Sequence, residues 1–292
     1  MREYYFNVAG FGFSVRLFDS LEVSRLLPSF HPFCCEKGET ALFRITVGTG
    51  AEDGRDEKGV LTESSSTDIG RVNIFKTGIG YRVEINNPDN HAVSVMNMNS
   101  DFTESVVCID DRNRFAGNML SIMIRMLYSQ RILSRDAAAI HASSVYKDGK
   151  SYLFLGKSGT GKSTHSALWM RYIEGCRLLN DDNPVIRVTD GRVMAYGTPW
   201  SGKTPCYKNL SFPVAGIVRL RQAQENRYYR LKDVDAFTAL LPSCALFRGE
   251  SLLADRLYST LTRVVGLVPV GRLDCRPDKE AALMCYDNIN KE

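Results

Sequence analysis

Short apolar segments separated by Gly, Asn and Asp occupy the first hundred residues of the chain. This alternation predicts β-strands at residues 4–17, 42–47, 72–75, 81–85 and 92–98. Residues 50–70 are rich in Gly, Asp, Glu and Ser and nearly lack apolar side chains, which predicts a mobile loop. We therefore expect an antiparallel, β-rich N-terminal subdomain over residues 1–114.

The pattern changes at residue 115, where apolar residues recur on nearly every side of a predicted helix. We expect this helix, at residues 115–136, to be buried and to link the two halves. Beyond it, strands are predicted at 138–146, 152–155, 178–179, 185–188, 192–196, 214–220 and 268–273, and helices at 234–241, 254–265 and 278–288. This order of elements predicts an α/β (or α+β) fold, with a second domain over residues 115–292.

Composition narrows the class of protein. The 292 residues are 44% hydrophobic, enough for a core domain with a smaller attachment. The net charge of +4 is spread along the chain, which argues against a nucleic-acid partner. Residues 1–6 do not resemble a signal peptide and no apolar run is long enough for a membrane span, so we expect a cytoplasmic protein without a membrane partner. Eight cysteines without C-x-x-C spacing argue against a zinc site or a disulfide framework and indicate that most are buried thiols, with the adjacent Cys34 and Cys35 as the exception. A homo-oligomer is compatible with the sequence.

The strongest local signal is GKSGTGKS, which runs from Gly156 to Ser163 and fits the P-loop pattern G-x-x-x-x-G-K-[ST]. Glycines let backbone N–H groups surround phosphate oxygens, and the following helix adds its N-terminal dipole. Lys162 would contact the β and γ phosphates, and the Ser163 hydroxyl would bind Mg²⁺. The pattern predicts an ATP–Mg²⁺ site formed by Gly156, Ser158, Gly159, Thr160, Gly161, Lys162, Ser163 and Thr164.

Two adjacent carboxylates, Asp181 and Asp182, follow an apolar segment downstream of the loop. Parallel strands beside a P-loop strand end at the same edge of the sheet, so we expect at least one carboxylate near the phosphates. Adjacent residues of a strand point in opposite directions, which favours one metal ligand and one proton acceptor. We name Asp182 with Ser163 as metal ligands, although the sequence leaves open which carboxylate is the base.

Two histidines lie near these motifs. His141 falls in the predicted strand before the loop, where a lone histidine is more often packed than catalytic. His165 follows the loop directly, and we expect it on the exposed side of the helix.

Taken together, IHASSV from Ile140, the P-loop and Asn180-Asp181-Asp182 resemble the catalytic domain of HPr serine kinase/phosphorylase. The loop is also similar to that of ATP-dependent phosphoenolpyruvate carboxykinase. The resemblance covers about residues 138–220 and, more loosely, 268–288. It implies that His141 lies near metal or phosphate, that Asp181 and Asp182 serve as proton acceptor and metal partner, and that ATP phosphorylates a hydroxyl. His141, Lys162, Asp181 and Asp182 are thus the candidate catalytic residues.

The chain departs from that family in two places. It lacks the Arg-Gly-rich signature near the protein-substrate site, having GTPWSGKTP at residues 197–205, and its N-terminal half differs from the usual partner domain. The acceptor therefore stays open between a protein, a peptide and a small molecule. Trp200, Lys203 and Arg219 are candidates for binding it or stabilising transition-state charge. The alternative is a nucleotide-binding sensor or assembly protein with little catalysis, which uses the β-rich half for interaction.

Overall fold

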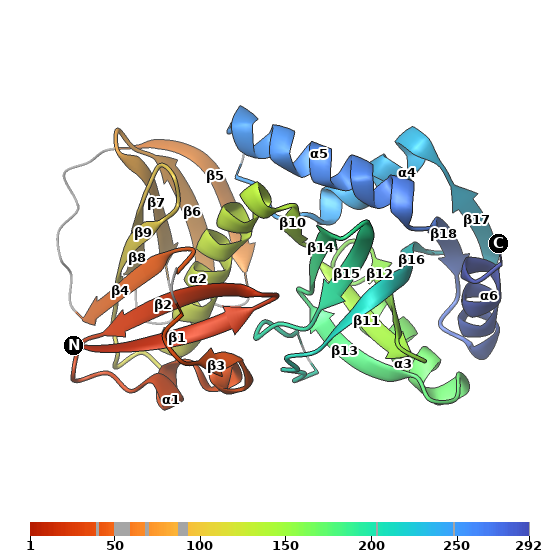
Figure 1. Cartoon of the computed structure of the whole chain (residues 1–292), viewed down its shortest axis with the longest axis horizontal. Helices are drawn as coiled ribbons and strands as arrows, with labels where there is room; N and C mark the ends of the chain where they lie inside the picture. Colours follow the sequence, from red (N-terminus) through yellow and green to blue (C-terminus); the bar gives the residue numbers. More distant parts are fainter. Residues whose placement is uncertain are drawn as a thin grey trace. The chain divides into compact units, whose positions relative to one another are not determined.

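The computed structural model describes residues 1–38, 41–49, 59–67, 70–86, 93–202, 204–247 and 249–291 (Figure 1). The chain is mixed α/β and forms two compact units. The first unit comprises Met1–Ile132 and Leu246–Ser251, and the second comprises Leu133–Ala245 and Leu252–Glu292. Across the described residues, no helix combines the length and the apolar character needed to cross a membrane.

The first unit is built on one nine-stranded sheet of order β3-β1-β2-β4-β9-β8-β7-β6-β5. Its strands are β1 Arg2–Val8, β2 Phe11–Leu17, β3 Cys34–Cys35, β4 Arg44–Thr49, β5 Val60–Thr67, β6 Gly70–Lys76, β7 Gly80–Asn86, β8 Val93–Asn99 and β9 Glu104–Ile109. The sheet is mixed, because β4 pairs in parallel with both β2 and β9. The expectation of a purely antiparallel unit is therefore wrong. The connection from β2 to β4 is long enough to carry the chain back to the edge of the sheet where β2 began, so that both strands run in the same direction. A tight hairpin reverses the chain and can join only antiparallel strands.

The expected loop at 50–70 is also wrong in part, since residues 60–67 form strand β5 on β6. Ladder hydrogen bonds to a neighbouring strand can hold a polar segment in a sheet without apolar side chains. The remainder of that loop at 50–58 and 68–69 lies outside the described residues.

Helix α2 (Ala116–Ile132) supplies much of the core of the first unit, together with α1 (Val23–Leu26) and η1 (Pro28–Phe33). It is largely buried and packs against β8, β9 and α1. Its Tyr128 ring contacts Phe13 and Phe43, while the Tyr128 hydroxyl donates a 2.9 Å hydrogen bond to the Val8 carbonyl. Phe247, on the returning segment Leu246–Ser251, contacts Tyr81 with ring centroids 5.3 Å apart. By these contacts α2 belongs to the first unit, whereas the sequence assigns it to the second domain.

The second unit contains a sheet of order β10-β14-β15-β16-β12-β11-β13, and β18 pairs with β16 on one side and β17 on the other. Its strands are β10 Ala137–Ala139, β11 Ala142–Lys147, β12 Lys150–Leu155, β13 Arg177–Asp182, β14 Val185–Thr189, β15 Arg192–Tyr196, β16 Ser211–Gln222, β17 Arg227–Leu231 and β18 Val270–Cys275. Strand β16 is parallel to β12 and β18. Strand β11 is antiparallel to both β12 and β13, so β12 and β13 run in the same direction.

The helices of this unit are α3 Lys162–Tyr172, α4 Asp233–Leu240, α5 Ser251–Leu267 and α6 Lys279–Ile289, with short turns η2 Leu133–Arg135 and η3 Leu241–Ser243. Helix α3 packs on β11, β12 and β13, and α6 packs on β16, β17 and β18. Trp169 of α3 is fully buried between them and contacts Phe154 of β12 and Tyr286 of α6. This apolar layer fixes α3 on one face of the sheet, directly after the P-loop.

Candidate active site

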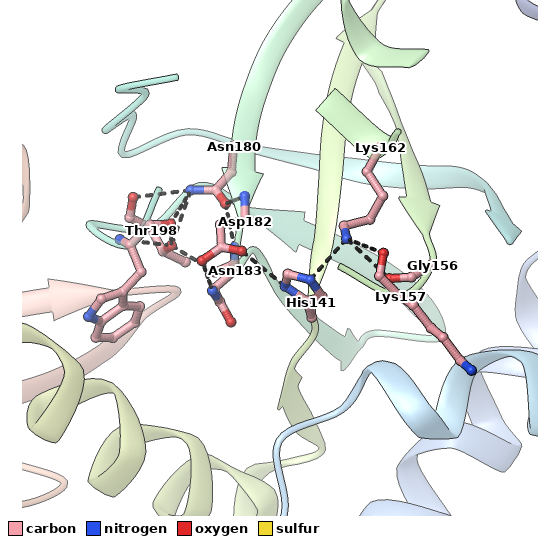
Figure 2. A network of polar contacts seen from close by, with 9 residues as sticks. His141, Gly156, Lys157, Lys162, Asn180, Asp182, Asn183 and Thr198 are labelled. Atoms are coloured by element: carbon pink, nitrogen blue, oxygen red, sulfur yellow. Dashed lines mark hydrogen bonds and ion pairs between the residues drawn. The ribbon is translucent and has the colours of Figure 1, made fainter. Parts of the chain in front are cut away.

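Sheet register brings the ends of three strands to one edge. Ala142, the first residue of β11, pairs with Leu155 at the end of β12 and with Asp182 at the end of β13. His141 precedes Ala142, and Gly156 follows Leu155. The segment 138–146 is therefore not one strand, as expected from the sequence, but two strands separated at residues 140 and 141. That break places His141 between the P-loop and the acidic pair (Figure 2).

The P-loop links β12 to α3 through glycines in conformations that L side chains rarely adopt. Gly159 has φ +79° and Gly161, which caps α3, has φ +101°. A Cβ built on Gly159 would meet nothing within 4 Å, so backbone conformation rather than crowding calls for glycine there. The first intrahelical bond of α3 runs from the His165 N–H to the Gly161 carbonyl, which leaves the preceding N–H groups as the free donors of a helix start. The loop therefore suits an anion.

The Lys162 side chain is buried at the centre of this edge and donates to three acceptors. Its Nζ lies 3.1 Å from the Gly156 carbonyl, 3.3 Å from that of Lys157 and 2.9 Å from His141 Nε2. On the other side of the ring, His141 Nδ1 lies 2.9 Å from Asp182 Oδ1. Because an ammonium can only donate, Nε2 is the acceptor and the proton of a neutral ring is on Nδ1, facing Asp182 (Figure 2). Lys162, His141 and Asp182 thus form one polar chain.

Burial lowers the pKa of Lys162, the charges of Asp182 and Asp181 oppose that shift, and the charge of Arg219 adds to it. Two of the present partners of Lys162 are main-chain carbonyls of the loop, and phosphate oxygens are acceptors of the same kind.

Asp181 differs from Asp182 in its surroundings. It is 3% exposed, and neither of its carboxylate oxygens has a hydrogen-bond partner in the protein. It pairs with Ser143, whose hydroxyl lies 2.6 Å from that of Ser166 on α3, and directly paired residues share a face of the sheet. The Asp181 side chain therefore lies on the α3 face and Asp182 on the opposite face. A buried, unpartnered carboxylate is costly alone and fits a cation.

Ser163 and Thr164 are exposed in the first turn of α3, as are Ser158 and Gly159 in the loop, so these groups are open to a ligand. Within the described residues, no group of three or more His, Cys, Asp and Glu side chains could enclose a metal ion. Mg²⁺ seldom needs such a group, because it is commonly held by one or two protein oxygens together with substrate phosphates and water. The donors present, Ser163 with one carboxylate, fit that pattern.

The three acceptor-binding candidates are placed differently. Trp200 is 5% exposed, and its carbonyl accepts from the Asn180 amide. Arg219 pairs with Leu155 in β16 and donates to the Ala239 carbonyl at 2.7 Å. Leu155 pairs in turn with Ala142, and Ala142 pairs with Asp182, so Arg219 and Asp182 belong to one row of paired residues across the sheet. Directly paired residues share a face, so both side chains lie on the same face of the sheet. Lys203 lies outside the described residues.

Sequence reasoning assigned no role to three polar residues at this edge. Asn180 and Thr198 are fully buried and tie the acidic pair to the segment after β15. The exposed Gln222 donates to the Gly159 carbonyl at the tip of the P-loop. Asn180 stands beside the acidic pair in the sequence, but only the fold brings Thr198 and Gln222 to this edge.

His165 is not on the exposed side of its helix, contrary to the sequence expectation. It is 3% exposed, contacts the Phe154 ring and accepts a 3.0 Å hydrogen bond from Trp169 Nε1. Burial lowers its pKa to about 4, so the ring is neutral at pH 7. The helix turns this position toward the apolar layer over β12, where Trp169, one turn further on, supplies a donor.

Known proteins show little similarity to this chain. No family model matches the sequence, and no curated protein matches it. Among solved structures, the Hpr(Ser) kinase/phosphatase from Coxiella burnetii is similar over 51% of this chain and 91% of its own, with a TM-score of 0.30 and 12% sequence identity. The roles proposed below therefore depend on this chain's own residues.

Proposed function

We propose that the protein is an HPr kinase-like phosphotransferase that moves the γ-phosphate of ATP to an acceptor hydroxyl, with Mg²⁺ bound at the same site. The observation that carries the proposal is the meeting, at one sheet edge, of the glycine loop, the Lys162 ammonium and the two carboxylates. A phosphate-binding loop alone needs no proton acceptor, whereas transfer to a hydroxyl does.

The loop N–H groups and Lys162 would bind the phosphate oxygens of ATP. Ser163 and Asp181 would hold Mg²⁺, which would neutralise charge on the phosphates. Asp181 faces α3 with both oxygens free, whereas the Asp182 carboxylate is already engaged by His141 and by the Asn183 amide. This choice differs from the ligand named from the sequence, Asp182.

Asp182 would then receive the acceptor proton as the new oxygen–phosphorus bond forms and the bond from the γ-phosphorus to its bridging oxygen in ATP breaks. His141 holds the Asp182 carboxylate through Nδ1 and is itself held by Lys162. Arg219, on the same sheet face as Asp182, would stabilise negative charge on the acceptor side.

The test is transfer of labelled γ-phosphate from ATP to a panel of protein, peptide and small-molecule hydroxyls in the presence of Mg²⁺. Lys162→Ala should abolish transfer and weaken ATP binding about 10-fold to 100-fold, the effect of losing a charge-assisted contact. Lys150→Ala removes an exposed lysine at the start of β12, the strand that precedes the loop, and should leave both properties unchanged. Full transfer by Lys162→Ala would refute the proposal.

The same experiment separates the kinase from a nucleotide-binding sensor. A sensor would bind ATP tightly by calorimetry and show neither transfer nor phosphate release with any acceptor. The unpartnered Asp181 and the Asp182–His141 pair favour the kinase, because a protein that only binds nucleotide has less use for a proton acceptor.

A further inference from the structure

A fully buried amide lies immediately behind the acidic pair. Asn180 is 0% exposed and uses both ends of its side chain. Its Oδ1 accepts from the N–H groups of Asp182 at 3.2 Å and Asn183 at 2.9 Å. Its Nδ2 donates to the Trp200 carbonyl at 3.0 Å and to Thr198 Oγ1 at 3.2 Å. This set of partners fixes the orientation of the amide, since a flipped amide would place NH₂ against two backbone N–H groups.

Thr198 completes the connection from the other side. Its side chain is also fully buried, and its hydroxyl donates to the Asn183 carbonyl at 2.7 Å. Asn183 is thus held at its N–H by Asn180 and at its carbonyl by Thr198. The turn that ends β13 has little freedom to move the carboxylates it carries.

The segment after Thr198 continues along the same turn. The Gly202 N–H donates to the Asp181 carbonyl at 2.7 Å, and Ser201 forms an isolated β-bridge with Asp182. A Cβ on Gly202 would lie 2.7 Å from the Asp181 carbonyl oxygen, so this approach depends on glycine. The main chain of both aspartates is therefore clamped, while the Asp181 carboxylate has no hydrogen-bond partner in the protein.

We infer that Asn180 and Thr198 are positioning residues that hold the turn bearing Asp181 and Asp182 in the geometry used for metal binding and proton transfer. The inference rests on the proposed function. Asparagine suits the position because its amide donates and accepts at once. Leucine would remove the side-chain acceptor of the Asp182 and Asn183 N–H groups and the amide donor to the Trp200 carbonyl, all in the interior. Partners behind a metal or catalytic carboxylate commonly contribute 10-fold to 100-fold to affinity or activity.

Thr198→Val removes the hydroxyl with almost no change of shape, and Thr198→Ser keeps the hydroxyl. A matched control is Thr260→Val, because Thr260 is also buried and donates to a main-chain carbonyl, that of Arg256 at 3.0 Å, on α5. We expect Thr198→Val to lower the turnover number about 10-fold or more. The ATP affinity measured with chelator should stay within about twofold, whereas the gain in affinity on adding Mg²⁺ should shrink about tenfold. Thr198→Ser and Thr260→Val should match the wild type in all three measurements.

Amide hydrogen exchange tests the inference on the nucleotide-free protein. In Thr198→Val and Asn180→Ala, the Asp182 and Asn183 amides should exchange at least about tenfold faster, as loss of a buried hydrogen bond worth about 1.4 kcal/mol would cause. The same amides should stay protected in Thr260→Val. Unchanged exchange, turnover and Mg²⁺ response in Thr198→Val would overturn the positioning roles. They would also be overturned if the ATP affinity measured in the presence of chelator fell as much as the response to Mg²⁺. A wild type that binds no ATP would instead refute the proposed function, and hydrogen exchange alone would then decide whether the residues hold the turn.

Discussion

The buried, uncharged His165 should make the second unit sensitive to mild acid. Its pKa is lowered by burial from 6.5 to about 4, and its Nε2 accepts the Trp169 N–H. Protonation would charge a ring among apolar side chains and replace an acceptor by a donor facing that N–H. The folded state therefore disfavours the proton that the unfolded state accepts readily.

A folded pKa below the unfolded one gives a stabilising contribution that is complete above pH 6.5 and is lost as the pH falls toward 4. The difference of about 2.5 pKa units corresponds to about 3.4 kcal/mol at full loss. Between pH 7 and pH 5 the same two pKa values give a loss of about 2 kcal/mol in the free energy of unfolding.

Urea denaturation followed by tryptophan fluorescence measures this loss in the right part of the molecule, because both tryptophans, Trp169 and Trp200, belong to the second unit. His165→Gln is the reference variant, since its side-chain oxygen can accept from Trp169 and does not titrate. The wild type should lose about 2 kcal/mol more than His165→Gln on going from pH 7 to pH 5. Equal losses in the two proteins would show that the ring is not buried in its neutral form.

Three further predictions concern a carboxylate, a glycine and a tyrosine. Asp181→Asn should raise the free energy of unfolding, measured by urea denaturation, by about 1 kcal/mol, because an unpaired amide is less costly to bury than an unpaired carboxylate. The same substitution should abolish phosphate transfer. A loss of stability would contradict this prediction. Gly159→Ala and Gly191→Ala should each lower the free energy of unfolding in urea by about 1 kcal/mol, since both residues have positive φ and open space around the added Cβ. Only Gly159→Ala should weaken ATP binding measured by calorimetry. Equal ATP affinity in both variants would count against the phosphate loop. Tyr128→Phe should cost about 1 kcal/mol in the first unit by scanning calorimetry, through loss of the hydrogen bond to the Val8 carbonyl, and an unchanged transition would contradict that role.

Local patterns in the sequence were enough to predict the α/β character of the chain, the buried α2 and the helix that leaves the phosphate loop. They also predict a phosphate-binding loop at residues 156–163, because its glycines and the lysine–serine pair stand within eight consecutive positions, and phosphate binding there stays a prediction. The roles of Lys162, His141, Asp181 and Asp182 stay predictions, although the fold brings the four to one edge of the sheet.

Tertiary structure alone decided how these residues face one another. Asp181 and Asp182 are equivalent in sequence, and they differ only because β13 pairs with β11 in a register that turns Asp181 toward α3 and Asp182 toward His141. Thr198 joins the site from a segment with no motif, and His165 is buried because Trp169 and Phe154 close around it. Strand register and side-chain packing depend on contacts between residues far apart in the chain, so no pattern of neighbouring residues could predict them.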